Sequence, residues 1–239
     1  PPAELALPAG ARLLTEASPG SYAARNRALR EAQGDILAFT DADCIPDPGW
    51  LSTALEQVEA GAVRIAGAVE VTFDSDTLNA AECFEKAFSF RQADNARRGV
   101  SVTANLITTR AVFERVGDFN DTLLSGGDFE WNLRAERAGV PLVFVAGCKV
   151  QHPARTTLGE LLEKHRRIAG TAPRHYGGGW RAIWLGFLPS LYALRQVWRD
   201  PALSLRERLL AFWMHYLLKV YRTTVHLRVR LGLAPPSRK

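Results

Sequence analysis

The stretch that decides the fold is Gly34-Asp-Ile-Leu-Ala-Phe-Thr-Asp-Ala-Asp-Cys-Ile-Pro46, in which a short apolar run ends on two acidic residues. The length and composition of segment 35–40 predict a buried strand. Asp41 and Asp43 follow it directly, at the end of a strand where ligands bind in open α/β sheets. Two carboxylates this close favour a hard cation such as Mn²⁺ or Mg²⁺, held against phosphate oxygens. Acidic loops without a metal share this pattern, so the pair alone does not decide the function.

Helical and strand-like segments alternate on both sides of this stretch. Helices are predicted at 21–33, 48–60, 77–97, 110–116 and 128–138, and further strands at 63–73, 100–108 and 142–145. Strands that alternate with helices predict an α/β, Rossmann-like fold with a mainly parallel sheet flanked by helices.

The last third of the chain has a different composition. Capping boxes at Thr157/Glu160 and Ser204/Glu207 predict two helices rich in leucine and aromatic residues. The longest uncharged run there, 182–194, is shorter than the ~20 residues that span a bilayer. These helices therefore suit either a membrane interface or packing on the sheet or a partner subunit.

Charge is concentrated in the same region. The chain carries a net charge of +5, whereas residues 195–239 alone hold ten Lys and Arg against two acids. We predict a catalytic domain at 1–155 and an amphipathic helical region at 156–239, with peripheral membrane contact through 180–230. Nucleic-acid binding is not expected, because the aromatic residues recur at helical spacing and form no stacking platform.

The cysteines and the N-terminus indicate the compartment. Cys44, Cys83 and Cys148 are scattered without metal-ligand spacing, which favours a reduced, cytosolic protein over a disulfide framework. No apolar segment follows a basic start, so no signal peptide is predicted. We expect a cytoplasmic protein with peripheral contact to the inner face of the cell membrane.

A second acidic motif, Ser125-Gly-Gly-Asp-Phe-Glu-Trp131, stands at the start of a predicted helix. Its glycines allow close backbone approach. Asp128 suits a general base that takes a proton from an acceptor hydroxyl. The alternative is that Asp128 is a helix N-cap and Glu130 a favourable charge in the first turn. A helix start would lower the pKa of Asp128, whereas neighbouring acids would raise it.

The third motif is Val150-Gln-His-Pro-Ala-Arg155, which follows the predicted strand at 142–145. His152 could ligate a metal or touch phosphate, and Arg155 could bind phosphate. A histidine with a purely structural role is the alternative.

Together these residues resemble a known family. The runs Ser18-Pro-Gly-Ser-Tyr-Ala-Ala-Arg-Asn-Arg27 and 34–46 resemble the donor half of family-2 glycosyltransferases with the GT-A fold. The runs Val116-Gly-Asp-Phe-Asn120 and 126–131 are similar to the acceptor half. The order and spacing of both halves match over residues 11–170.

The resemblance implies an inverting transfer from a nucleotide-sugar donor to a saccharide or lipid-linked acceptor, in cell-envelope or polysaccharide synthesis. It implies one in-line displacement without the covalent intermediate of a retaining glycosidase. By this match Asp128 is the base, Asp43 is the main metal ligand, and Asp41 contacts the nucleotide ribose or the ion. With His152 from the third motif, the expected metal ligands are Asp43, Asp41 and His152. The expected substrate and nucleotide contacts are Arg25, Asn26, Asp41, Gly127, Glu130, Trp131 and Arg155.

One departure and two alternatives accompany this prediction. Family members begin with a strand, a helix and a second strand, and nothing before Ser18 supplies them, so we expect an N-terminally incomplete chain with an exposed sheet edge. A nucleotidyltransferase uses similar acids but releases pyrophosphate. A non-catalytic membrane-surface or assembly module would need neither acidic motif.

Overall fold

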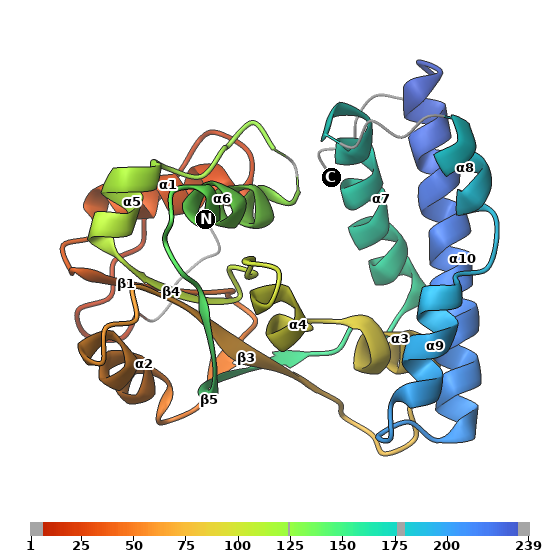
Figure 1. The fold of residues 1–239 in the computed structure, drawn as a ribbon, viewed down its shortest axis with the longest axis horizontal. Coiled ribbons are helices and arrows are strands. Elements are labelled where there is room, and N and C mark those ends of the chain that lie inside the picture. Colours follow the sequence, from red (N-terminus) through yellow and green to blue (C-terminus); the bar gives the residue numbers. More distant parts are fainter. Residues whose placement is uncertain (1–6, 124, 176–179, 234–239) are drawn as a thin grey trace.

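The computed structural model describes residues 7–123, 125–175 and 180–233 and shows a sheet with helices on both faces and a helical bundle at one end (Figure 1). In these ranges the strands are β1 (Ile36–Thr40), β2 (Ile45–Pro46), β3 (Arg64–Thr72), β4 (Asn105–Thr109) and β5 (Val143–Pro153). The helices are α1 (Ser21–Glu31), α2 (Trp50–Glu59), α3 (Ala80–Phe88), α4 (Gln92–Ala96), α5 (Arg110–Val116), α6 (Gly127–Arg137), α7 (Leu158–His175), α8 (Trp180–Gly186), α9 (Leu191–Arg199) and α10 (Leu205–Arg230).

The sheet has the strand order β1-β4-β3-β5-β2 and is mixed. Strand β4 is antiparallel to both β1 and β3, β2 is antiparallel to β5, and β3 runs parallel to β5. The α/β prediction is confirmed, but the sheet is not mainly parallel. After β3, the chain passes through α3 and α4, and β4 then inserts between β1 and β3 in the opposite direction. The alternation of helices and strands in the sequence does not indicate this reversal.

Two apolar clusters hold the helices on the sheet. One face of the sheet packs against α1, α5 and α6, through a cluster that includes Leu37, Leu106, Phe113 and Trp131. The other face packs against α2, through Trp50 and its neighbours. The burial of these apolar side chains is the main force that fixes the helices around the sheet.

The helix predicted over 77–97 is divided into α3 and α4. Asn79 caps α3 in a reciprocal capping box with Glu82. The backbone then becomes extended at Ser89, and Phe90 adopts a φ of 47°. A helix cannot continue through this left-handed conformation, which is uncommon for non-glycine residues, so α4 begins only at Gln92.

Strand β5 is longer than predicted and ends at Pro153 instead of Val145. Its register with β3 shifts between Gly67 and Ala68, which pair with Val145 and Lys149. The residues of β5 around Gly147, which interrupt the apolar pattern, therefore form a bulge. The extension places His152 inside the sheet, opposite Val71, and not after the strand as the sequence had suggested.

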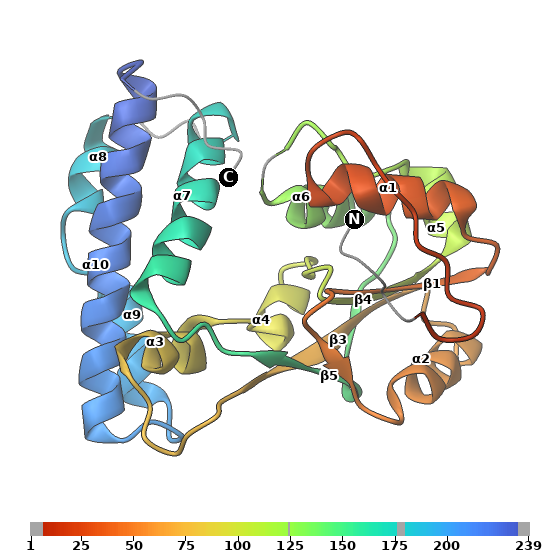
Figure 2. The ribbon, with the colours of Figure 1, turned by 180° about the vertical axis from the view of Figure 1, so that it is seen from behind.

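The C-terminal helices form a bundle with α3. Residues of α3, α9 and α10 share one buried cluster around Cys83, Val197 and Ala211. Helices α3, α7 and α10 share a second around Phe84, Leu161 and Leu218. Both predicted capping boxes form, at Ser204 and Glu207 of α10 and at Thr157 and Glu160 before α7. Figures 1 and 2 show α7 on the side of the bundle that faces α1 and α6, and α8 on the outer side of α10.

Of the helices that the structure describes, none combines the length and the apolar character needed to cross a membrane.

Arg64 is the largest charged side chain that the fold buries completely. Its guanidinium donates to the carbonyl oxygens of Asn132 and Val140, each at 2.7 Å, and to the Glu136 carboxylate at 2.8 Å. Strand β3 is thereby tied to α6, the helix that begins beside Asp128.

We expect Arg64→Met to lower the free energy of unfolding by about 3 kcal/mol, because two buried carbonyls lose their donor and the carboxylate its charged partner. Urea denaturation followed by circular dichroism measures this loss. The matched variant Arg137→Met, at an exposed position on α6, should stay within about 0.5 kcal/mol of the parent. A loss below about 1 kcal/mol for Arg64→Met would contradict the role we assign to the buried guanidinium.

Candidate functional site

The two-residue strand β2 places the Asp41–Asp43 loop against β5. Ile45 pairs with Gln151, and the Cys44 N–H donates to the Asp41 carbonyl at 3.0 Å to close the turn before it. This pairing brings Asp43 beside His152, with Asp43 Oδ2 and His152 Nε2 3.4 Å apart. The structure therefore brings together two of the predicted metal ligands from positions more than a hundred residues apart.

The orientation of His152 suits a neutral ligand. Its Nδ1 lies 2.7 Å from the Pro153 carbonyl oxygen and donates to it, so the neutral form of the ring would direct its Nε2 lone pair at Asp43. The ring is 3 % exposed and packs on Phe90 at a centroid distance of 4.5 Å, whereas the Asp43 side chain is 57 % exposed. A nitrogen lone pair and a carboxylate oxygen 3.4 Å apart repel each other, and a cation bound by both atoms would relieve this repulsion.

Cys44 completes this group of ligand atoms in the described part of the chain. One atom each from Asp43, Cys44 and His152 lies within 4.8 Å of the others. Burial raises the pKa of the Cys44 thiol, so the sulfur is a poorer ligand than the carboxylate and the imidazole. Asp41 lies outside the group, because its Oδ1 accepts from Arg25 Nη2 at 2.6 Å.

Helix α1 connects the two acidic motifs. Arg25 holds Asp41, and three residues earlier the Tyr22 hydroxyl donates to Asp128 Oδ1 at 3.2 Å. The Arg25 guanidinium also lies over the Tyr22 ring, 5.7 Å from its centroid. Tyr22 was not among the predicted site residues. Its spacing of three from Arg25 on one helical face is the feature that would have indicated it.

Asp128 is the second residue of α6, not its N-cap. The N-cap is Gly126, which adopts a φ of 77° that favours glycine. A Cβ on Gly127 would come within 2.7 Å of the Tyr22 ring, so glycine is needed for the close approach of α1 to α6.

The electrostatics of Asp128 differ from the effect expected of a helix start alone. Burial raises the pKa of Asp128 and outweighs the lowering by hydrogen bonds from the Phe129 N–H and the Tyr22 hydroxyl and by the Arg25 charge. Both the Phe129 N–H, at 2.9 Å, and the Tyr22 hydroxyl donate to Oδ1. The pKa of Tyr22 is also raised, by burial and by the Asp128 charge, so the phenol stays protonated and remains a donor.

Several other predicted contacts have structural partners instead. Trp131 is completely buried, stacks on Phe113 and donates to the Gly117 carbonyl, so its place in the structure is that of a core residue. Asn26 exchanges two hydrogen bonds with the Phe119 backbone in the core.

The other two predicted contacts form ion pairs. Glu130 pairs with Arg134 at 2.8 Å, one helical turn away. Arg155 and Lys164 both neutralise the fully buried Glu85, at 3.0 and 3.3 Å, so Arg155 is not directed at the acidic motifs. Strand length explains this difference, because β5 carries Arg155 past His152 to the bundle.

Comparisons with known proteins find sequence similarity to glycosyltransferases. Residues 5–116 match the family model described as Glycosyl transferase family 2. Glycosyltransferase AglE of Haloferax volcanii is 38 % identical over 161 residues, which cover 65 % of this chain and 51 % of that protein. Pre-mycofactocin glycosyltransferase of Mycobacterium tuberculosis is 27 % identical over 165 residues, covering 65 % of this chain and 34 % of the relative. The chain thus spans about half the length of the first relative and a third of the second.

Solved structures give weaker similarity. The mannosyltransferase PcManGT from Pyrobaculum calidifontis, solved with GDP-Man and Mn²⁺, superposes with a TM-score of 0.47 at 14 % identity, over 90 % of this chain and 55 % of that one. TarS residues 1–349 of S. aureus, solved with UDP-GlcNAc, gives 0.46 at 14 % identity, over 90 % and 73 %.

The sequence matches identify a glycosyltransferase domain within the chain. Residues 5–116 match glycosyltransferase family 2, and the similarity to AglE extends over 161 residues. The predicted GT-A-type α/β fold with a C-terminal helical extension agrees with this family and with the architecture described above.

Proposed function

We propose that the chain is the catalytic part of a metal-dependent, inverting glycosyltransferase. It would move a sugar from a nucleotide-sugar donor to a hydroxyl of a saccharide or lipid-linked acceptor, in cell-envelope or polysaccharide synthesis. The single observation that carries the proposal is the joining of both acidic motifs by α1, with Arg25 on Asp41 and Tyr22 on Asp128. The family match supports the same reaction class.

Asp43 and His152 would hold the metal, with Asp41 and Arg25 next to it on the nucleotide side. A carboxylate oxygen and a neutral imidazole nitrogen fit Mn²⁺, and the carboxylates fit Mg²⁺. When bound, the ion would neutralise the charge of the departing diphosphate.

Asp128 would act as the base through Oδ2, because Tyr22 and Phe129 both occupy Oδ1. The acceptor oxygen attacks the anomeric carbon, the bond from that carbon to the diphosphate oxygen breaks, and the hydroxyl proton passes to Asp128. The raised pKa of Asp128 makes its carboxylate a stronger base than an exposed aspartate. The Tyr22 hydrogen bond fixes the carboxylate in one orientation.

The experiment is a product assay with a panel of UDP- and GDP-linked sugars, with Mn²⁺ or with excess chelator. We expect nucleoside diphosphate release only with the metal, and a product of inverted anomeric configuration by NMR. Release of pyrophosphate would instead identify a nucleotidyltransferase. Turnover that persists in excess chelator would count against the metal site.

We also propose peripheral membrane contact through 180–230, at the inner face of the membrane of the cell, with no nucleic-acid partner. The described part of this region exposes large apolar side chains beside arginines. The most exposed are Trp184, Leu185, Leu191, Tyr192, Leu205 and Trp213. Aromatic and basic side chains together are typical of helices at a bilayer interface.

A further inference from the structure

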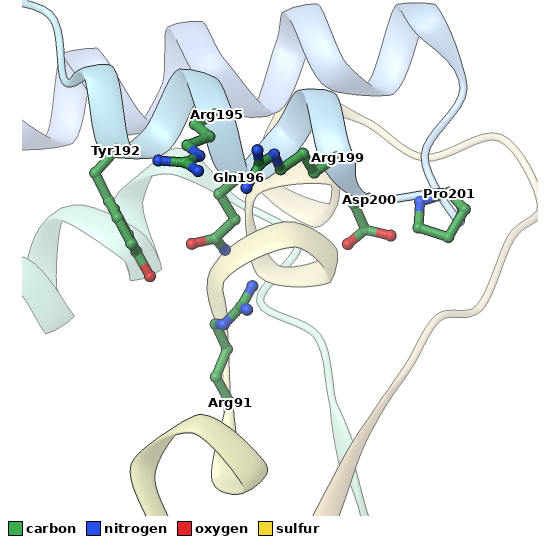
Figure 3. Close-up of a pocket in the computed structure, with 7 residues that line it drawn as sticks. All are labelled: Arg91, Tyr192, Arg195, Gln196, Arg199, Asp200 and Pro201. Carbon is green, nitrogen blue, oxygen red and sulfur yellow. The ribbon is translucent and has the colours of Figure 1, made fainter. Parts of the chain in front are cut away.

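An open, positively charged groove lies between α9 and the connection from α3 to α4, away from both acidic motifs. Its volume is about 560 Å³, and it is lined by Arg91 and by residues of α9 and the turn after it, from Tyr192 to Pro201. Figure 3 shows Arg91 extending toward α9, while Arg195 and Arg199 reach into the groove on either side of Gln196.

Two of the arginines in this groove lack a partner. Among the residues that the structure describes, Arg195 and Arg199 form neither an ion pair nor a side-chain hydrogen bond, whereas Arg91 pairs with Asp94. The one acid in the lining, Asp200, accepts from the Ala202 N–H. Adjacent guanidinium groups without a counter-charge attract a phosphate, which each can bind through two hydrogen bonds.

The helix that carries these arginines also exposes large apolar side chains. Leu191 is 81 % exposed, Tyr192 67 % and Trp198 47 %, all on α9, and Tyr192 also lines the groove. Exposed apolar side chains on the same helix as the unpaired arginines mark an interaction surface whose partner is not purely apolar.

We propose that the groove binds the phosphate of an anionic bilayer lipid. Arg195 and Arg199 contact the phosphate, while Leu191, Tyr192 and Trp198 enter the interfacial layer. Charge decides against a second copy of the chain, because a two-fold contact would bring the unpaired arginines of both copies together. This inference rests on the peripheral contact in the proposed function and names the residues that make it.

The test is sedimentation of the 239-residue chain with vesicles of phosphatidylcholine, with and without phosphatidylglycerol, at low salt. We expect Arg195→Gln with Arg199→Gln to weaken binding to the anionic vesicles about 25-fold, since each cation at such a surface contributes about fivefold. The matched pair Arg98→Gln with Arg137→Gln removes the same charge from exposed positions elsewhere and should cost less than about threefold. Leu191→Ser with Trp198→Ser should weaken the binding that remains at high salt.

Three results of the sedimentation test would overturn the proposal: no sedimentation with anionic vesicles, equal binding to neutral vesicles, or equal losses for the two arginine pairs. Binding of inorganic phosphate, measured by calorimetry, in the absence of any vesicle binding would assign the groove to free phosphate and would also overturn it. If the chain did not bind vesicles but associated with itself, and Leu191→Ser abolished that association, the apolar side chains of α9 would belong to a contact with a second copy. This result would also overturn the proposal. Nucleotide release from the donor should be unchanged in all these variants without vesicles, so loss of the transferase and loss of the lipid site are measured separately.

Discussion

Asp43→Ala is expected to lower metal-dependent glycosyl transfer by about 10³-fold, equivalent to about 4 kcal/mol of transition-state stabilisation. The Asp43 carboxylate faces the Nε2 lone pair of His152, and its removal leaves the imidazole without the oxygen ligand that completes the metal position. Turnover is measured as nucleoside diphosphate release in Mn²⁺, and metal affinity as Mn²⁺ binding by electron paramagnetic resonance. Both should fall together.

Asp47→Ala is the matched control for this prediction. Asp47 lies just after β2, four residues from Asp43, and its carboxylate pairs with Lys149 at 3.2 Å and accepts from Gln151, outside the group of ligand atoms. We expect Mn²⁺ affinity within about threefold of the parent for this variant. If Asp43→Ala retained full Mn²⁺ affinity, or if Asp47→Ala lost as much, the metal position would be wrong.

Asp128→Asn is expected to reduce transfer by about 10² to 10⁴-fold without loss of folding, because the amide cannot take the acceptor proton. Asparagine has nearly the same shape, and its side-chain oxygen can still accept from Tyr22 and Phe129. Donor affinity should not fall, since the role proposed for Asp128 is on the acceptor side. The measurement is the rate of transfer at saturating donor, together with the midpoint of thermal unfolding.

The pKa of Asp128 gives this variant a second, independent result. The folded pKa is raised, so the folded state binds more protons than the unfolded state, and stability falls as pH rises from the ordinary value of 3.8 through the folded pKa. Asparagine removes this penalty. At neutral pH the midpoint of Asp128→Asn should therefore be no lower than that of the parent, and any advantage should disappear at strongly acidic pH.

Glu130→Gln serves as the control for the base, because it removes a carboxylate from the same helical turn and breaks only the pair with Arg134. Its transfer rate should stay within about threefold of the parent. Equal losses of transfer rate in Asp128→Asn and Glu130→Gln would assign the effect to the negative charge at the start of α6. An unchanged transfer rate in Asp128→Asn would show that Asp128 is not the base.

Local features of the sequence predicted most of the elements, whereas pairings between distant segments could not be predicted. Capping residues such as Ser204 and Glu207 act within one helical turn, and their pattern is visible in the chain. The contact between Asp43 and His152 depends on the pairing of β2 with β5, which no local pattern specifies. The mixed direction of the sheet has the same origin.

The same distinction explains why some predicted site residues have structural partners. Trp131 and Asn26 belong to the matching motifs, but their positions in those motifs reflect packing of α6 and α1 in the core. The break at Phe90 depends on a backbone conformation that its residue type disfavours. Surrounding structure fixes it, including Gln92, whose buried amide bonds to the backbone at Gly67, Val102 and Asn105.

The position of Arg25 on α1 makes donor and proton binding thermodynamically linked. Its positive charge lowers the pKa of Asp128 while its guanidinium holds Asp41. An anionic donor that engages Arg25 offsets this charge, so the proton affinity of Asp128 rises when the donor is in place. By reciprocity, protonation of Asp128 strengthens donor binding by the same factor. The affinity for a nucleotide sugar should therefore increase as pH falls through the pKa of Asp128.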